Sequence, residues 1–81
     1  MKNISVIIPS LNPDEKLVRV VDSLIRHGFE DIILVNDGSD SGHMEPFNRV
    51  REYPQCTMLN HEVNKGKGRA LKTAFEYCLA N

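Results

Sequence analysis

Two segments of the chain combine glycine with polar or charged side chains in patterns that suit nucleotide and phosphate binding. Asp37 is followed by Gly38, so a carboxylate that can accept hydrogen bonds from a base or a ribose stands beside a residue that permits close approach. Residues 65–69 read Lys-Gly-Lys-Gly-Arg. These three cations and two glycines precede or open a predicted helix, whose N-terminus attracts anions, so the segment is suited to hold a diphosphate.

Each segment also has a purely structural interpretation. An Asp-Gly pair is typical of a turn in which the Asp side chain bonds its own backbone, and a basic glycine-rich run can be a solvated loop. The run lacks the spacing of a Walker A loop and does not follow the first strand. Gly66 and Gly68 begin like a dinucleotide-binding fingerprint, but Leu71 stands where the third glycine is required, which disfavours that site.

The cysteines and histidines do not form a pattern that indicates a nucleophile or a metal centre. Cys56 and Cys78 belong to no CxxC pair, so two reduced, largely buried thiols and a reducing compartment are expected. His27 lies near a predicted helix end and His43 in a polar loop. His61 follows a strand end, where it could touch a ligand. No Ser-His-Asp or Cys-His spacing argues for nucleophilic catalysis.

Hydrophobic periodicity predicts three strands that alternate with three helices. The strands are expected at 4–8, 31–36 and 56–59, and the second and third helices at 44–52 and 68–79. The first helix should follow Asn12 as its N-cap and Pro13 as its first residue, and it should stop at Gly28. The expected inward faces are Leu17, Val20, Val21, Leu24 and Ile25 on the first helix, and Leu71, Ala74, Phe75, Cys78 and Leu79 on the last.

This order, β-α-β-α-β-α with short connections, predicts a three-layer α/β/α fold around a mainly parallel sheet, with residues 1–81 as one unit. Ligands of such sheets bind at the carboxyl ends of the strands. The loops 9–12, 37–40 and 60–68 all leave such ends and are expected to form one composite pocket.

The overall charge and hydropathy argue against two classes of partner. The 81 residues carry a formal net charge of -1, which does not favour nucleic-acid binding. No stretch is long and apolar enough for a signal peptide core or a membrane span, so a soluble, cytoplasmic segment is expected.

Three motifs in order resemble family 2 glycosyltransferases, most closely the dolichyl-phosphate mannosyl- and glucosyltransferase-like members. They are Val-Ile-Ile-Pro-Ser-Leu-Asn at 6–12, Ile-Leu-Val-Asn-Asp-Gly-Ser at 33–39 and Asn-Lys-Gly-Lys-Gly-Arg-Ala at 64–70. The family patterns are roughly VIIPxYN, VDDGSxD and NxGKGxA. The resemblance covers nearly the whole chain and implies the nucleotide-binding half of a GT-A-type, Rossmann-like fold.

The resemblance also implies which residues bind the nucleotide. The implied contacts are the loop of Pro9, Leu11 and Asn12 at base and ribose, Asn36 at a ribose hydroxyl, Asp37 and Gly38 at the base, and Gly66, Lys67 and Gly68 near the phosphates. The chain departs from the pattern where Leu11 replaces a usual Tyr, Pro13 a common Glu, and Asn36 the first Asp of DDGS. These departures bear on the identity of the nucleotide.

The family places a DxD motif for Mg²⁺ or Mn²⁺ and a general base after the next strand, and neither is found in residues 1–81. Catalytic and metal-binding residues are therefore expected outside this segment, which alone should be inactive. The resemblance implies a UDP- or GDP-sugar donor, a lipid phosphate or polysaccharide acceptor, and a site of action at the cytoplasmic face of a membrane. An uncovered parallel edge favours a homo-oligomer. A non-catalytic nucleotide- or phosphate-binding module and a nucleotidyltransferase-like fragment remain the alternatives.

Overall fold

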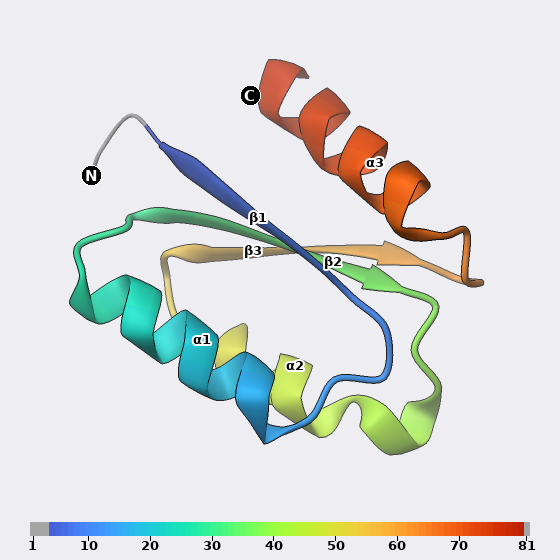
Figure 1. Cartoon of the computed structure of the whole chain (residues 1–81), viewed down its shortest axis with the longest axis horizontal. Helices are drawn as coiled ribbons and strands as arrows, with labels where there is room; N and C mark the ends of the chain where they lie inside the picture. The colour runs from blue at the N-terminus through green and yellow to red at the C-terminus, as the bar shows by residue number, and fades with distance from the viewer. Residues whose placement is uncertain (1–3, 81) are drawn as a thin grey trace.

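Strands and helices alternate through residues 4–80, the part of the chain that the computed structural model describes. The elements are β1 (Ser5–Ser10), α1 (Glu15–Arg26), β2 (Asp31–Asp37), the short 3-10 helix η1 (Ser41–His43), α2 (Glu45–Val50), β3 (Cys56–His61) and α3 (Lys67–Ala80). The strands form a parallel sheet in the order β1-β2-β3. Helices α1 and α2 cover one face and α3 the other (Figure 1), which confirms the three-layer α/β/α prediction.

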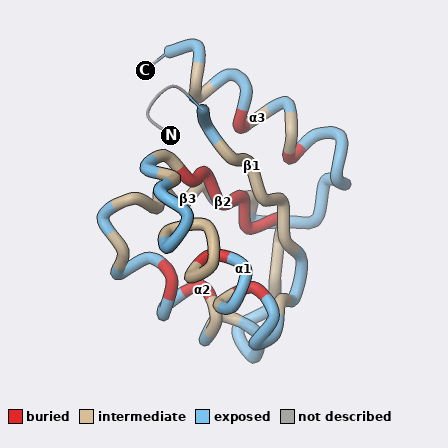
Figure 2. The backbone as a smooth tube through the Cα atoms, turned by 60° about the vertical axis from the view of Figure 1, so that its left-hand side comes forward, coloured by how far each residue is buried: buried red, intermediate tan, exposed pale blue. Residues whose placement is uncertain are grey.

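The central strand β2 supplies the core of both faces. Its side chains alternate, so Ile32 and Leu34 join the cluster beneath α1 and α2, whereas Ile33 and Val35 pack against α3. All four are at most 1% exposed. Figure 2 shows this concentration of buried residues along β2. An almost continuous apolar run is what a parallel strand covered on both faces requires.

The strands extend further toward the loops than the sequence pattern predicts. β1 includes Pro9 and Ser10, β2 includes Asp37, and β3 continues to His61. Pro9 is tolerated because β1 is an edge strand of the described sheet, where one side of the backbone makes no ladder bonds. The consequence for function is that Asp37 and His61 lie on rigid strand ends instead of in loops.

The N-cap prediction for the first helix was wrong. Asp14 caps α1, and its side chain accepts a hydrogen bond from the Lys16 backbone N–H at 2.9 Å. Asn12 instead adopts a positive φ of 48° and contacts the loop that follows β2. The helix therefore starts two residues later than expected, because a competing tertiary contact engages Asn12.

Three predicted inward residues point to solvent. Val20 is 49% exposed, Phe75 59% and Leu79 89%. Helix α3 presents Ala70 and Ala74 to the sheet, and both are fully buried. Small side chains let the helix backbone approach Ile33 and Val35 closely, so the two alanines are buried while Phe75 and Leu79 are left outside.

Candidate functional site

The three loops that leave the strand ends converge, as the fold-level argument predicts. They line a hollow of about 340 Å³ between the end of β1 and the start of α3. Its lining residues are Pro9, Ser10, Leu11, Asp37, Asn64, Gly66 and Lys67. Of the predicted nucleotide-binding residues, Pro9, Leu11, Asp37, Gly66 and Lys67 therefore share one cavity, and the structure adds Ser10 and Asn64.

Asn12 holds the first loop against the second. Its backbone N–H donates to the Ser39 hydroxyl at 2.8 Å, and its side-chain carbonyl accepts from the Asp40 backbone N–H at 3.1 Å. The residue does not line the hollow. Its predicted contact with the nucleotide stays a prediction, while its observed contacts shape the wall that Leu11 forms.

Gly38 lies against the backbone of the third loop. It adopts a φ of +79°, and a Cβ placed there would stand 2.3 Å from the Asn64 nitrogen and 2.4 Å from the Val63 carbonyl carbon. Only glycine combines that backbone conformation with such an approach. Gly38 therefore sets the distance between the second and third loops.

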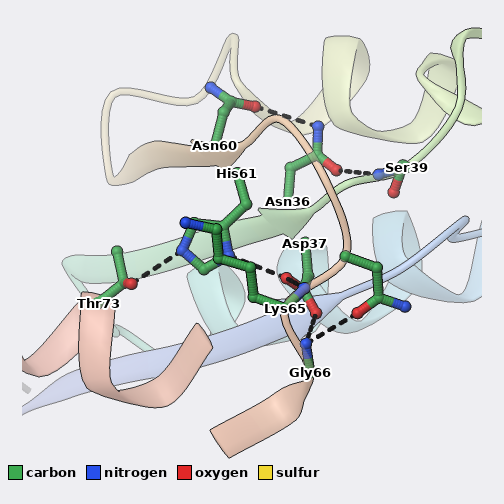
Figure 3. Close-up of polar contacts among 9 residues, drawn as sticks. Asn36, Asp37, Ser39, Asn60, His61, Lys65, Gly66 and Thr73 are labelled. Atoms are coloured by element: carbon green, nitrogen blue, oxygen red, sulfur yellow. Dashed lines mark hydrogen bonds and ion pairs between the residues drawn. The ribbon is translucent and has the colours of Figure 1, made fainter. Parts of the chain in front are cut away.

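Asp37 is the best-anchored side chain of the hollow. Side chains alternate along a strand, so Asp37 lies on the same face as Ile33 and Val35 and points toward the α3 side of the sheet. Its Oδ1 accepts from His61 Nδ1 at 2.9 Å and from the Lys65 backbone N–H at 2.9 Å, and its Oδ2 accepts from the Gly66 N–H at 3.0 Å (Figure 3). Asp37 thus joins β2, β3 and the loop before α3.

These bonds change the acidity of the carboxyl group. The hydrogen bond from His61, followed by that from the Lys65 backbone N–H, holds the pKa of Asp37 below its ordinary value of 3.8, although burial opposes them. A carboxyl whose pKa is lower in the folded state stabilises that state above the unfolded pKa, and the contribution is lost as the pH falls through the folded pKa.

We expect Asp37→Asn, which keeps the shape and removes the charge, to unfold at lower urea than the parent protein at pH 7. The difference between the two midpoints should begin to shrink below about pH 4, where the carboxyl of the unfolded parent takes up a proton, and should go on shrinking as the pH falls through the lower pKa of the folded state. Urea titrations followed by circular dichroism from pH 7 to pH 3 would measure this. A difference that stays constant to pH 3 would contradict the assigned role of the charge.

Asn36, the neighbour of Asp37, faces the other side of the sheet. Its Nδ2 donates to Asn60 Oδ1 at 3.1 Å, and its Oδ1 accepts from the Ser39 backbone N–H at 2.9 Å. Figure 3 shows this pair of contacts apart from those of Asp37. Asn36 is buried, and it supports the turn after β2. Its contact with a ribose remains a prediction.

The basic glycine-rich run forms the entrance to α3. Gly66 has a φ of +90° and Lys67 begins the helix, so the free N–H groups of the first turn open beside the hollow. Lys65, Lys67 and Arg69 are exposed. Gly68 lies within that first turn but does not line the hollow. The arrangement can stabilise an anion by charge and by backbone donors.

His61 is the site residue that sequence reasoning underestimated. It is the strand partner of Asp37, and its side chain is only 8% exposed. Its Nε2 lies 2.8 Å from the Thr73 hydroxyl on α3. The signal available in the sequence was that Asp37 and His61 each lie just beyond a predicted strand. Which residues are paired in register could not be read from either strand alone.

The described residues do not offer a metal centre or a membrane span. Within residues 4–80, no group of three or more His, Cys, Asp or Glu side chains is arranged to hold a metal ion. Over the same part of the chain, no helix has the length and apolar character to cross a membrane. The groups that the hollow presents to a ligand are hydrogen-bonding groups and the cation of Lys67.

Known proteins share this sequence pattern and this fold. The family model described as Glycosyl transferase family 2 matches residues 5–81 of this chain. A dolichyl-phosphate beta-glucosyltransferase of Trichomonas vaginalis is 31% identical over an alignment 80 residues long, which covers 85% of this chain and 25% of that protein. A UDP-N-acetylglucosamine–dolichyl-phosphate N-acetylglucosaminyltransferase of Methanococcus voltae is 30% identical over an alignment 92 residues long, which covers 93% of this chain and 37% of that protein.

A solved structure supports the fold. The mannosyltransferase PcManGT from Pyrobaculum calidifontis, in complex with GDP-Man and Mn²⁺, superposes with a TM-score of 0.68 at 23% identity, over 90% of this chain and 23% of that one. The chain thus spans about a quarter to a third of the length of these proteins. On the match over residues 5–81, the chain belongs to family 2 of the glycosyltransferases.

Proposed function

We propose that this chain forms the donor-nucleotide pocket of a glycosyltransferase that transfers a hexose from a nucleoside diphosphate sugar to a lipid phosphate of the dolichyl type. The observation that carries the proposal is the single hollow in which Asp37, Gly66 and Lys67 meet the Pro9–Leu11 loop. Membership of the family supports the reaction class, and the names of two relatives include a dolichyl-phosphate acceptor. A lipid acceptor would bring the whole protein to a membrane surface, and action on the cytoplasmic side of that membrane is part of the proposal.

The hydrogen-bonding capacity of Asp37 bears on the base. A carboxylate offers about four acceptor positions, two on each oxygen. His61 and Lys65 use both positions on Oδ1, and Gly66 uses one on Oδ2. One position remains, on Oδ2. This free acceptor position suits a base with a single N–H at its hydrogen-bonding edge, such as uracil. Guanine suits it less well, because its adjacent N–H groups need an acceptor on both carboxylate oxygens. We therefore favour UDP over GDP as the donor nucleotide.

The start of α3 suits the diphosphate. Sugar transfer leaves negative charge on the departing diphosphate, and fixed donors that face this charge lower the barrier. Lys67 lines the hollow, and Lys65 and Arg69, two residues before and after it in the sequence, are exposed. A divalent cation is part of the proposal for the whole protein, since the structural neighbour holds Mn²⁺. Residues 4–80 do not supply a ligand cluster that fits one.

Calorimetric titration of the purified protein with uridine, UDP and GDP tests the proposal. UDP should bind about tenfold more tightly than GDP, because guanine would leave one N–H without an acceptor. Lys67→Ala should weaken UDP binding about tenfold and leave uridine binding unchanged, since the lysine contacts only the diphosphate. Lys72→Ala, on an exposed position of the same helix, is the matched control and should bind like the parent.

Two results would contradict this proposal. A parent protein that binds neither UDP nor GDP has no donor pocket. Equal losses of uridine and UDP affinity in Lys67→Ala would mean that the lysine supports the fold of the hollow and not the diphosphate.

A further inference from the structure

Three side chains, one each from β2, β3 and α3, form a row of hydrogen-bonded groups behind the hollow. Thr73 on α3 contacts His61 Nε2 at 2.8 Å, and His61 Nδ1 contacts Asp37 Oδ1 at 2.9 Å. Figure 3 shows His61 between the other two. The side chains of His61 and Asp37 are 8% and 7% exposed. Asp37 lines the hollow, whereas His61 and Thr73 are not among its lining residues.

The direction of each hydrogen bond follows from the chemistry of the groups. An ionised carboxylate only accepts, so Nδ1 of His61 must carry a proton and donate it to Asp37. In the neutral ring Nε2 is then the acceptor, and the Thr73 hydroxyl is its donor. A threonine inside a helix commonly bonds the backbone of the preceding turn. Here its hydroxyl contacts the imidazole instead and can donate to the Nε2 lone pair of the Nδ1–H tautomer that the Asp37 carboxylate selects.

We propose that His61, held by Thr73, is a positioning residue for the donor pocket: it fixes Asp37 so that the remaining acceptor position on Oδ2 faces the nucleotide base. This inference rests on the proposed function. His61 is suited to the task because it is the strand partner of Asp37, and the sheet therefore holds both residues in register.

The backbone donors of the third loop do not replace His61. Lys65 and Gly66 also bond Asp37, but both are exposed residues of a loop. A loop that borders a ligand changes its position more readily than a strand end. His61 therefore holds the carboxylate from a strand end, independently of the loop, before a ligand binds. Preorganisation of this kind raises affinity by lowering the ordering cost of binding.

Two variants of His61 distinguish the roles of its two ring nitrogens. The amide nitrogen of Asn occupies the place of Nδ1, and that of Gln the place of Nε2. His61→Asn should keep UDP affinity within about threefold of the parent, because a donor to Asp37 remains. His61→Gln should weaken UDP binding about tenfold, since it loses that donor. Circular dichroism and urea midpoints verify that both variants fold. Equal UDP affinities for the two folded variants would overturn the inference.

A spectroscopic measurement tests the same arrangement without a ligand. Nitrogen-15 chemical shifts of the neutral His61 ring, recorded at alkaline pH, should show the proton on Nδ1. Thr73→Ser should retain this tautomer, because its hydroxyl can still donate to Nε2. A ring protonated on Nε2 alone in the parent would overturn the inference. The two proposals fail differently: a parent protein without nucleotide affinity contradicts the donor pocket, whereas an Nε2–H tautomer contradicts only the positioning role.

Discussion

Gly38→Ala should unfold the protein at a much lower urea concentration than the parent and abolish nucleotide binding. A left-handed backbone costs a residue with a Cβ about 1–2 kcal/mol. The Cβ would also stand 2.3 Å from the Asn64 nitrogen, and overpacking of this kind costs about 1–3 kcal/mol more. Backbone atoms cannot rotate away as a side chain can, so the second and third loops must separate. Urea unfolding and UDP titration would measure both effects.

Two other glycines provide a graded control for this prediction. Gly66 has a φ of +90°, but a Cβ added there would have no atom within 4 Å, so Gly66→Ala should lose only the backbone cost of about 1–2 kcal/mol. Gly68 has neither a positive φ nor a neighbour within 4 Å of that position, and Gly68→Ala should be neutral or stabilising by up to about 1 kcal/mol in the helix. Equal unfolding midpoints for the three variants would contradict the argument from close approach.

Phe47→Ala should cost about 3–5 kcal/mol of the free energy of unfolding. Phe47 is fully buried, and it packs in the cluster beneath α1 and α2 with Ile32, Leu34 and Val50. A small domain has about 5–15 kcal/mol of stability in total, so this variant should be close to unfolded at room temperature. Urea titration followed by circular dichroism would determine the loss.

Phe75→Ala is the matched control, since it makes the same chemical change on a surface that is 59% exposed. Its free energy of unfolding should change by no more than the value of about 0.5 kcal/mol that is typical of a surface substitution. A loss as large as that of Phe47→Ala would mean that Phe75 is buried, as its spacing with Leu71 and Leu79 suggests. That result would contradict the arrangement in which Ala70 and Ala74 face the sheet.

The Asp37–His61–Thr73 chain has a consequence for how the pocket is built. Asp37 lines the hollow and is held in part from behind, by His61 and through it by Thr73, neither of which lines the hollow. Substitutions behind the hollow can therefore change affinity without touching the nucleotide. This is the usual relation between a contacting group and the residues that orient it.

The order of elements and the location of the site were predictable from the sequence. Continuous apolar strands such as 31–36 and the glycine at 28 are local signals, because they depend on side-chain type and on backbone conformation within a few residues. The convergence of the loops after β1, β2 and β3 also followed, because parallel strands bring their carboxyl ends to one edge. Pro9, Leu11, Asp37, Gly66 and Lys67 accordingly meet in one hollow.

The choice of helix face was decided only by the tertiary structure. On α3 the sequence offers two rows at helical spacing, one with Leu71, Phe75 and Leu79 and one with Ala70 and Ala74. Side-chain size favours burying the first row, but the separation of helix and sheet decides which row fits. That separation depends on contacts far apart in the chain.

The roles of individual polar groups were settled in the same way. The sequence by itself determined that Asn12, Asn36, Asp37 and His61 would lie near one edge of a parallel sheet. It did not determine which would face the hollow. Strand register pairs Asp37 with His61, and alternation sends Asn36 to the opposite face, where Asn60 and Ser39 satisfy it. Register arises from the packing of the whole sheet, so only the tertiary structure could assign these partners.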